Sequence, residues 1–434
     1  MSRFIITLLL ITSLAGPAVA KDSPEKILAL AEAVKIALQN NPSIKEAEAG
    51  KEGARADAQG AKADFLPKAS AQYSYARLAD QPFQRVSGVE RFSGDENAHH
   101  WDITLTQPLF SGFALTSKKQ MAEIAVDIQN LERERTTINV SQDLRIAWFE
   151  TLFAERLGRV TEENVAALSA HQQNAQGFFR QGIISRNDLL KAEAALAQAL
   201  QERERATADS EIARSRLVTI LGTDLPSDSR LEDISAIDPQ PYELDDLVSE
   251  AMHNSPVLKS YRLGLAQFDS SITLARSTAY PTVALVGKYE QNGNDLAAET
   301  NAYTNDHNAS IALTAKWDFY DWGKTRANVM KQKSAKKMLA EKTRAMEDQT
   351  GLEVKRAYLD LHVAEKNIGT ARQGLEQAGE NWRITELQYQ NQVATSTDVL
   401  DSRSLLSQSE GNYFRALYGY RIALARLERT VGRK

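Results

Sequence analysis

The distribution of proline constrains this chain more than any other feature of its sequence. The 434 residues include 11 prolines, yet none lies between Pro108 and Pro226 and none follows Pro281. A proline inside a helix costs about 3 kcal/mol, because it lacks the N–H donor and its ring clashes with the preceding turn. Both stretches are rich in Ala, Gln, Glu, Arg and Leu, so they are where we expect long, uninterrupted helices.

The sequence also repeats itself once. Asn41-Pro42 corresponds to Ser255-Pro256 at an offset of 214 residues, and Leu109-Phe110 corresponds to Phe319-Tyr320 at an offset of 210. The offset changes once, by four residues between Pro67 and Leu109, and is constant on either side of that segment. Such similarity indicates two copies of one structural module. We therefore predict the following organisation: a signal peptide at 1–20, repeat 1 at 21–222, a linker at 223–241 and repeat 2 at 242–434.

Each repeat is predicted to contain the same elements in the same order. A first helix is expected at 30–64 and again at 244–278. Alternating apolar and polar residues then predict a β-hairpin, at about 68–112 and 282–322, with polar loops at 79–100 and 291–308. A very long helix follows at 114–180 and 324–390, and at ~1.5 Å per residue it would measure about 100 Å. A turn and a second, shorter helix complete each repeat. The last helix has an apolar heptad seam, which is typical of a coiled coil: Tyr413, Leu417, Tyr420, Leu424, Leu427 and Val431.

The first twenty residues have the pattern of a signal peptide. Arg3 precedes an apolar run, and Ala18-Val19-Ala20 is a small-residue cleavage site, so we expect cleavage after Ala20 and export from the cytoplasm. An uncleaved membrane anchor is the alternative, but the apolar run is short for a bilayer span. The chain has no cysteine, so it can form no disulfide and carry no lipid on an N-terminal cysteine.

Several classes of function have little support in the sequence. The formal net charge of -5 gives no basic footprint for nucleic acid. We find no catalytic constellation, phosphate-binding loop or metal-ligand spacing, and therefore expect no enzymatic activity, cofactor or metal. The neighbouring His99 and His100 are more compatible with a solvated loop than with a metal site.

The predicted strands require more than one chain. At about ten residues each they are long enough to cross a bilayer as tilted strands, but four strands cannot close into a barrel. Open edges in lipid would leave backbone groups without partners, so two chains (eight strands) or three (twelve strands and a wide lumen) are needed. Trp101, Trp317 and Trp322 lie in or beside the hairpins, as in an aromatic girdle. Packing of these residues in a soluble core remains the alternative.

The chain resembles the TolC family of outer-membrane efflux and secretion channels. The motifs that support the resemblance are QPLFSGF after the first hairpin, DFYDWG as its counterpart, and the repeated FRQGIISRNDLLKAEAAL and YQNQVATSTDVLDSRSLL. The resemblance implies a mainly α protein with a small β part. It would form a homotrimer with a 12-stranded barrel in outer-membrane lipid and a helical tunnel in the periplasm. It also implies two partners, a periplasmic adaptor and an inner-membrane transporter.

The two repeated turns are explained first by local stereochemistry. Gly182 can adopt the left-handed conformation that ends a helix, Ser185 can cap the next helix, and Asp188 completes a capping-box pattern. Ile184 and Leu189 would form a hydrophobic staple. Thr395 and Asp398 repeat the cap in the second copy, where Asn391 would supply the left-handed residue or a non-glycine would occupy position 392 at a cost of about 1 kcal/mol. By the resemblance, the first turn is also an adaptor-docking surface: Gly182, Ile183, Ser185, Asp188 and Leu189, with Thr395 from the second turn.

Asp401 follows Asp398 by one helical turn and is too far into the helix to act as a cap. The resemblance places Asp398, Asp401 and Tyr389 at the periplasmic gate, where a trimer would hold a ring of six aspartates. A solvated helix face is the simpler alternative for Asp401. Members of the family often have an arginine between turn and cap, whereas this chain has Ala394, so the sequence does not identify the residues that hold the gate closed. Nor does it determine whether the cargo is a drug or a polypeptide. A soluble periplasmic coiled-coil scaffold or adaptor is the rival function.

Overall fold

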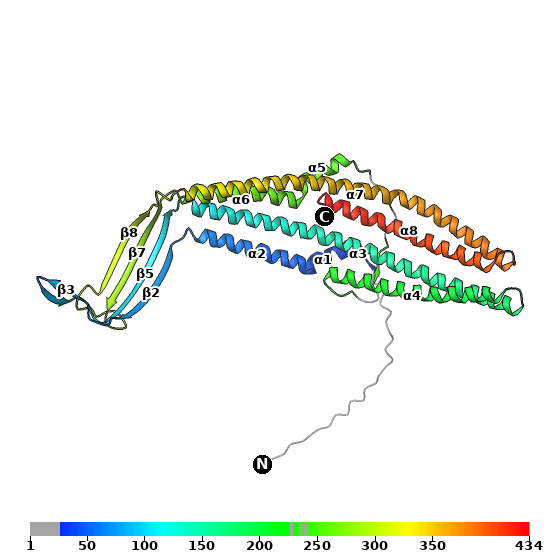
Figure 1. The fold of residues 1–434 in the computed structure, drawn as a ribbon, viewed down its shortest axis with the longest axis horizontal. Helices are drawn as coiled ribbons and strands as arrows, with labels where there is room; N and C mark the ends of the chain where they lie inside the picture. Colours follow the sequence, from blue (N-terminus) through cyan, green and yellow to red (C-terminus); the bar gives the residue numbers. More distant parts are fainter. Residues whose placement is uncertain (1–26, 226–228, 234–236, 238–240, 434) are drawn as a thin grey trace, which may run out of the picture.

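The computed structural model describes residues 27–225, 229–233, 237 and 241–433. The expected signal peptide and its cleavage site lie outside these residues. The described chain is elongated, with a small sheet at one end, helices along its length and two helical turns at the far end (Figure 1).

The longest helices have the predicted bounds. Helix α3 spans Ala114–Arg180 and α7 spans Lys324–Gln390, each with 67 residues. The shorter helices that return from the turns are α4 (Arg186–Leu221) and α8 (Ser396–Thr430). Each long helix packs along its shorter partner, and the seam predicted for the last helix is largely buried, with Leu427 and Val431 at 1% and 0% exposure.

The first helix of each repeat is interrupted, which corrects the prediction of continuous helices at 30–64 and 244–278. The structure has α1 (Leu30–Asn40) followed by α2 (Pro42–Ala63), and α5 (Leu244–Asn254) followed by α6 (Pro256–Ser277). Proline at the start of each second helix pushes the preceding residue out of the helical region. Asn41 and Ser255 use that conformation to cap the new helix, accepting hydrogen bonds from Ser43 N (2.9 Å) and Leu258 N (3.5 Å).

The four long strands form one antiparallel sheet in the order β2-β5-β7-β8. Their bounds are β2 (Lys68–Arg77), β5 (Asn97–Phe110), β7 (Thr282–Gly293) and β8 (His307–Lys316). The pairs β2–β5 and β7–β8 are the two predicted hairpins, and β5–β7 joins the two repeats, with Trp101 opposite Gln291. Strands β2 and β8 are the edges of the sheet.

The region predicted as a polar loop at 79–100 contains a second hairpin, so that prediction was wrong. Strands β3 (Phe83–Val86) and β4 (Val89–Phe92) pair across a turn in which Ser87 and Gly88 have positive φ. The strands FQRV and VERF show no alternation of apolar and polar residues in the sequence, and in the structure Arg85 pairs with Glu90 across the hairpin. His99 and His100 belong to β5, where His99 contacts the Tyr73 hydroxyl at 2.7 Å.

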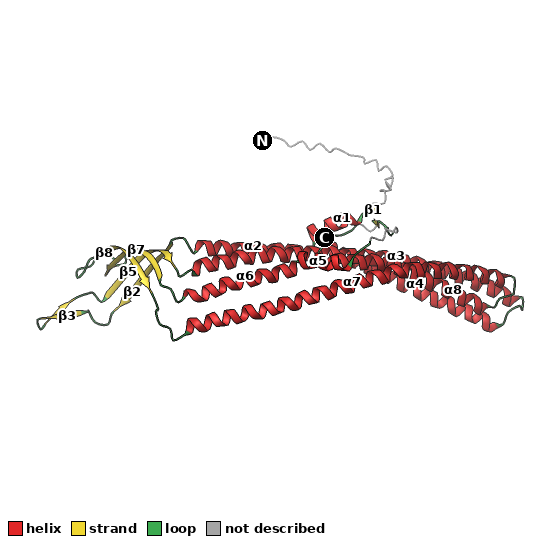
Figure 2. Cartoon of the chain, turned by 90° about the horizontal axis from the view of Figure 1, so that it is seen from above, coloured by secondary structure: helices red, strands yellow, loops and turns green. Residues whose placement is uncertain are grey.

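The helices continue the order of the strands. Helix α2 packs on α3, α3 on α6, and α6 on α7, so they form one layer that extends lengthwise from the end that carries the sheet (Figure 2). Where α1 and α4 meet α3 and α8, the core centres on Trp148, Leu144 and Tyr418, and the short strands β1 (Ile27–Leu28) and β6 (Arg230–Leu231) pair beside it. A second core contains Leu247, Val354 and Leu427. Among the described helices, none has the length and apolar character of a membrane span.

Gly222 allows the end of α4 to pack closely against the backbone between α1 and α2. It ends α4 with a φ of +69°, and an added Cβ would lie 2.8 Å from the backbone carbonyl of Asn40. We predict that Gly222→Ala lowers the thermal unfolding midpoint, by a free energy of at least about 1–2 kcal/mol, because both the conformation and the contact become unfavourable.

The matched control is Gly158→Ala inside α3, where an added Cβ meets no atom within 4 Å. It should stabilise the helix by about 0.5–1 kcal/mol. Equal midpoints for the two variants, measured by circular dichroism in one detergent, would contradict this account of Gly222.

Candidate functional site

The two repeated turns lie side by side at the end of the molecule that is farthest from the sheet (Figure 1). Side-chain contacts join them. Lys191 Nζ on α4 donates to Thr397 Oγ1 on α8 at 3.1 Å, His171 Nε2 on α3 contacts Ser396 Oγ at 2.9 Å, and the rings of Phe178 and Tyr389 pack at 5.6 Å. The turns therefore form one structural unit, which we call the tip.

Both turns use the same backbone hydrogen bonds. At the first, Gly182 N donates to Phe179 O (3.0 Å) and Ile183 N to Phe178 O (2.9 Å); at the second, Gln392 N donates to Tyr389 O (2.9 Å) and Val393 N to Gln388 O (2.8 Å). Gly182 has a φ of +73° as predicted, and Gln392 has a φ of +62°. The left-handed residue of the second turn is therefore Gln392 and not Asn391, whose φ is -90°.

The predicted caps are present. Ser185 Oγ accepts from Asp188 N at 3.2 Å, and Thr395 Oγ1 accepts from Asp398 N at 3.2 Å. At the second turn the Asp398 carboxylate also accepts from Thr395 N (2.8 Å), which completes a reciprocal capping box. The hydrogen bond from the Thr395 hydroxyl, followed by that from its backbone N–H, holds the pKa of Asp398 below its usual value.

Asp398 and Asp401 lie together in a depression of about 430 Å³ on the surface of the tip. Both carboxylates are exposed, and Ala394 lines the same depression. The three-residue spacing within α8 thus places the two acidic residues that the sequence singles out on one side of the helix, where both line this depression.

Tyr389 is placed differently from these aspartates. Its side chain is 3% exposed and packs between His171 (ring centroids 4.7 Å apart) and Phe178, inside the tip and not in the depression. Burial, and then the charge of Glu386, raises the pKa of the Tyr389 phenol. In one chain, Tyr389 thus stabilises the contact between the two turns.

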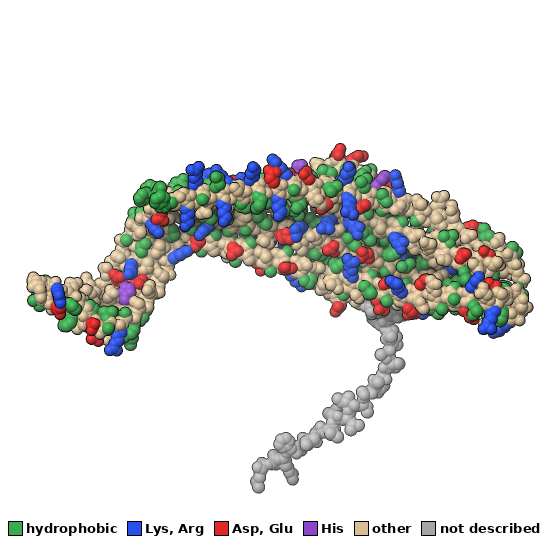
Figure 3. All heavy atoms as spheres, in the orientation of Figure 1, with side chains coloured by type: hydrophobic (Ala, Val, Ile, Leu, Met, Phe, Trp, Pro, Cys, Tyr) green, Lys and Arg blue, Asp and Glu red, His purple; other side chains and the backbone are tan. Residues whose placement is uncertain are grey.

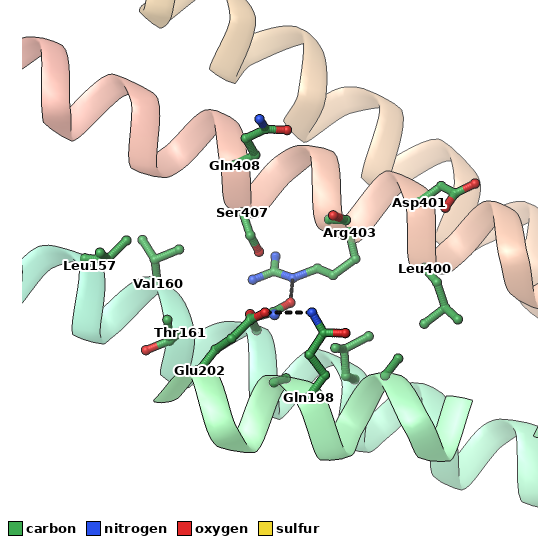
Figure 4. A pocket seen from close by; sticks show the side chains of 15 residues that line it. Leu157, Val160, Thr161, Gln198, Glu202, Leu400, Asp401, Arg403, Ser407 and Gln408 are labelled. Carbon is green, nitrogen blue, oxygen red and sulfur yellow. Dashed lines mark hydrogen bonds between the residues drawn. The ribbon is translucent and has the colours of Figure 1, made fainter. Parts of the chain in front are cut away.

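Arg403 is a site residue that the sequence analysis missed. It is 5% exposed, its Nε donates to Asn164 Oδ1 on α3 at 3.0 Å, and its guanidinium lies 5.7 Å from the ring centroid of Trp382 on α7. It points into a cavity of about 470 Å³ between α3, α4 and α8 (Figure 4). Burial lowers its pKa, and its Nη2 has no hydrogen-bond partner among the described residues.

A signal for Arg403 exists in the sequence. Extending the heptad seam of α8 backwards from Tyr413 gives Glu410, Leu406, Arg403 and Val399, with the same spacing of three and four. The seam therefore contains two charged residues, and burial raises the pKa of Glu410. Asp401 lines both the Arg403 cavity and the surface depression, so α8 links the buried charge to the exposed carboxylates.

The tip also presents apolar side chains to solvent. Val393 is 75% exposed, Leu190 50% and Ile183 42%, whereas Leu189 is half-buried. Gly182, Ser185 and Thr395 are exposed beside them. An apolar surface rimmed by polar residues is suited to binding another protein. Within the described residues no cluster of His, Cys, Asp or Glu could hold a metal ion.

The two turns differ in backbone strain, which predicts opposite effects of exchanging their central residues. Gln392→Gly should stabilise the protein and Gly182→Gln should destabilise it, each by about 0.5–1 kcal/mol, since left-handed backbone is unfavourable with a Cβ but glycine loses more entropy on folding. Thermal midpoints and the rate of limited proteolysis at the tip would measure both. Changes of the same sign would refute the assignment.

His171 predicts a pH dependence of stability. Burial is the main reason that its folded-state pKa lies below the usual value, while the charge of Glu386 opposes the shift. The unfolded chain therefore binds more protons as the pH falls below about 6.5, and the native state loses stability there.

His171→Gln should reduce the loss of thermal midpoint between pH 7.5 and 5.5. The control is His253→Gln, which alters an exposed side chain in the last turn of α5. If both variants keep the full pH dependence, His171 is not responsible for it.

Comparisons with known proteins agree with this architecture. The curated relatives include Nodulation protein T of Rhizobium leguminosarum bv. trifolii, 22% identical over 381 residues (84% of this chain and 80% of the relative). Protein CyaE of Bordetella pertussis (strain Tohama I) is 26% identical over 367 residues, which cover 81% of this chain and 73% of that protein. Among solved structures, the Campylobacter jejuni CmeC outer membrane channel matches with a TM-score of 0.79 and 16% identity, covering 98% of this chain and 94% of that one.

The family model described as outer membrane efflux protein matches residues 33–223 and 247–433, which correspond to the two repeats. On this evidence, the chain belongs to the outer membrane efflux protein family.

Proposed function

We propose that three copies of this chain form a channel through the outer membrane and the periplasm, and that this channel is the exit duct of an efflux or type I secretion system. The single observation that supports this most is the four-stranded sheet with two open edges, β2 and β8, above helices in the same lateral order. Pairing β8 of one copy with β2 of the next would satisfy both edges and give twelve strands.

The assembled helices would continue the channel below the membrane. The layer α2-α3-α6-α7 would be repeated three times around the lumen, and the helical pairs α3/α4 and α7/α8 would extend it to the tip. At ~1.5 Å per residue, 67 residues measure about 100 Å, a length suited to crossing the periplasm. The cargo, whether small molecules or polypeptides, would pass without any chemistry performed by the channel.

We assign the tip two roles. Asp398 and Asp401, one pair from each copy, would form the acidic ring of the periplasmic gate, and Tyr389 would support it from the interior of the tip. The exposed apolar residues of the first turn would dock the periplasmic adaptor, which in turn would connect the channel to an inner-membrane transporter. Exposed carboxylates around a narrow opening attract cations, including divalent ones.

Cell fractionation distinguishes the channel from the rival function, a soluble periplasmic scaffold. The channel should be recovered with outer membranes and migrate as a trimer in mild detergent after removal of residues 1–20. Recovery in the soluble periplasmic extract would favour the scaffold. Deletion of the gene, followed by assays of drug sensitivity and of the secreted proteome, would separate efflux from secretion.

The acidic ring predicts a change in conductance. Asp398→Ala combined with Asp401→Ala should raise the single-channel conductance in planar bilayers and weaken block by divalent cations, because the ring and its ion-mediated contacts are lost. Asp401→Asn alone should weaken the block while leaving the Thr395–Asp398 capping box intact.

Asp188→Ala is the matched control, since it removes the corresponding cap residue of the first turn. Conductance and block that match the unmodified protein in both Asp401 variants would remove the gate assignment. An equal effect of Asp188→Ala would attribute the change to loss of a helix cap.

A further inference from the structure

The membrane-proximal part of α7 has a charge that sets it apart from the rest of the molecule. Between Gly323 and Ala340 the chain contains six Lys or Arg residues and no Asp or Glu, although the whole protein has a net charge of -5. We call this set the basic segment: Lys324, Arg326, Lys331, Lys333, Lys336 and Lys337. Figure 3 shows basic side chains gathered on this end of the helical layer.

The basic segment is not neutralised within the chain. Lys336 pairs with Asp269 of α6 at 2.6 Å. The other five side chains are exposed and form no ion pair with a described residue. Lys333 and Lys337 lie one turn apart, and like charges at this spacing destabilise a helix. Within one copy, the arrangement therefore leaves positive charge available to an external anion.

The position of the first two cations is also unfavourable for the helix itself. Lys324 and Arg326 lie in the first turn of α7, which contains no acidic residue. The N-terminal end of a helix dipole is positive, so a cation there is unfavourable for the helix. The equivalent segment of repeat 1 lacks this excess, because Lys118 and Lys119 are balanced by Glu123 and Asp127. The excess of charge is thus a property of repeat 2 alone.

Exposed aromatic side chains lie immediately above the basic segment. Trp322 is 87% exposed, Phe319 82% and Tyr320 66%. Trp322 has a φ of +55°, and the Asp321 carboxylate supports this turn by accepting from Gly323 N (3.0 Å) and Thr325 N (2.7 Å). Tryptophan and tyrosine concentrate at the boundary between hydrocarbon and headgroups. This turn therefore marks the level at which the proposed channel would leave the hydrocarbon.

Distances along the helix place the cations at the level of the headgroups. Lys333 follows Lys324 by nine residues, which is about 14 Å of helix. The headgroup layer is about 5–7 Å thick on each side of the bilayer, and the potential of anionic lipids extends a further Debye length, about 8–10 Å. The long side chains of Lys and Arg can also reach back toward the interface.

We propose that the basic segment binds the anionic headgroups of phospholipids in the leaflet that faces the helical part of the molecule. The proposal rests on the membrane placement given under the proposed function and adds a lipid specificity to it. Each Lys or Arg near an anionic surface strengthens binding to it, and several neighbouring cations act together. The segment would thereby anchor the base of each subunit to the periplasmic leaflet, while the aromatic turn anchors its apolar edge.

The experiment compares lipid retention by the full-length mature protein, delipidated in mild detergent. Labelled phosphatidylglycerol or phosphatidylcholine is added, and the lipid that remains with the purified protein is quantified at 50 and 300 mM salt. The test variant changes Arg326, Lys331, Lys333 and Lys337 to Gln. The control variant changes four exposed cations farther along the same helix to Gln: Lys355, Arg356, Lys366 and Arg372.

We expect the unmodified protein and the control variant to prefer phosphatidylglycerol, and the preference to fall at high salt. The test variant should retain about tenfold less phosphatidylglycerol. Equal retention by the two variants would overturn the proposal. Lipopolysaccharide and soluble peptidoglycan fragments are tested in the same assay. The proposal would also be overturned if the test variant kept its phosphatidylglycerol but lost retention of either of these, since the partner would then be a different anion.

Failure of the proposed function gives a different result in the same preparation. A protein that forms no trimer and gives no conductance in planar bilayers would overturn the membrane placement, and with it this inference. A trimer of normal conductance without any preference for phosphatidylglycerol would overturn the lipid inference alone.

Discussion

The pairing of β5 with β7 is the contact on which the arrangement of the whole chain depends. It joins the two repeats in one sheet, and the order β2-β5-β7-β8 then determines the order of the helices connected to these strands. Helices α2 and α6 lead into the sheet, whereas α3 and α7 leave it, and because the four pack side by side each long helix begins at a fixed place in the layer. The two turns meet at the far end because the helices that lead to them start in register.

Much of this fold could be predicted from the sequence because proline and the repeat are strong signals. The bounds of the two 67-residue helices follow from the absence of proline and from the turn residues at both ends. The break at Asn41-Pro42 could have been predicted too, since proline at the first helical position favours a new helix over a continuous one. The hairpin of β3 and β4 was harder, because its four-residue strands are exposed on both faces and show no alternation.

In the candidate site, too, some features depend on residues close in the sequence and others depend on tertiary contacts. Caps and left-handed turns depend on residues a few positions apart, so Gly182, Ser185 and Thr395 were predictable. The left-handed Gln392 was foreseen only as one of two options, because asparagine adopts left-handed backbone more readily than glutamine and local preference therefore favours Asn391. The burial of Tyr389 and the cavity around Arg403 depend on contacts with α3, which lies more than 200 residues away in the sequence. The heptad seam indicates which side of α8 faces the interior, whereas the partners of a buried polar side chain on that side depend on tertiary packing.

The equal lengths of α3 and α7 have a consequence for how such a chain can change over time. Inserting one residue into either helix would advance its turn by about 1.5 Å and rotate it by about 100°, so that the contacts between the two turns would no longer match. Substitutions have no such effect on register. Relatives can therefore differ at most positions and still align along nearly their whole length, as the Campylobacter jejuni channel does with 16% identity over 98% of this chain. In this architecture the length of each long helix is therefore constrained more strictly than the identity of most of its residues.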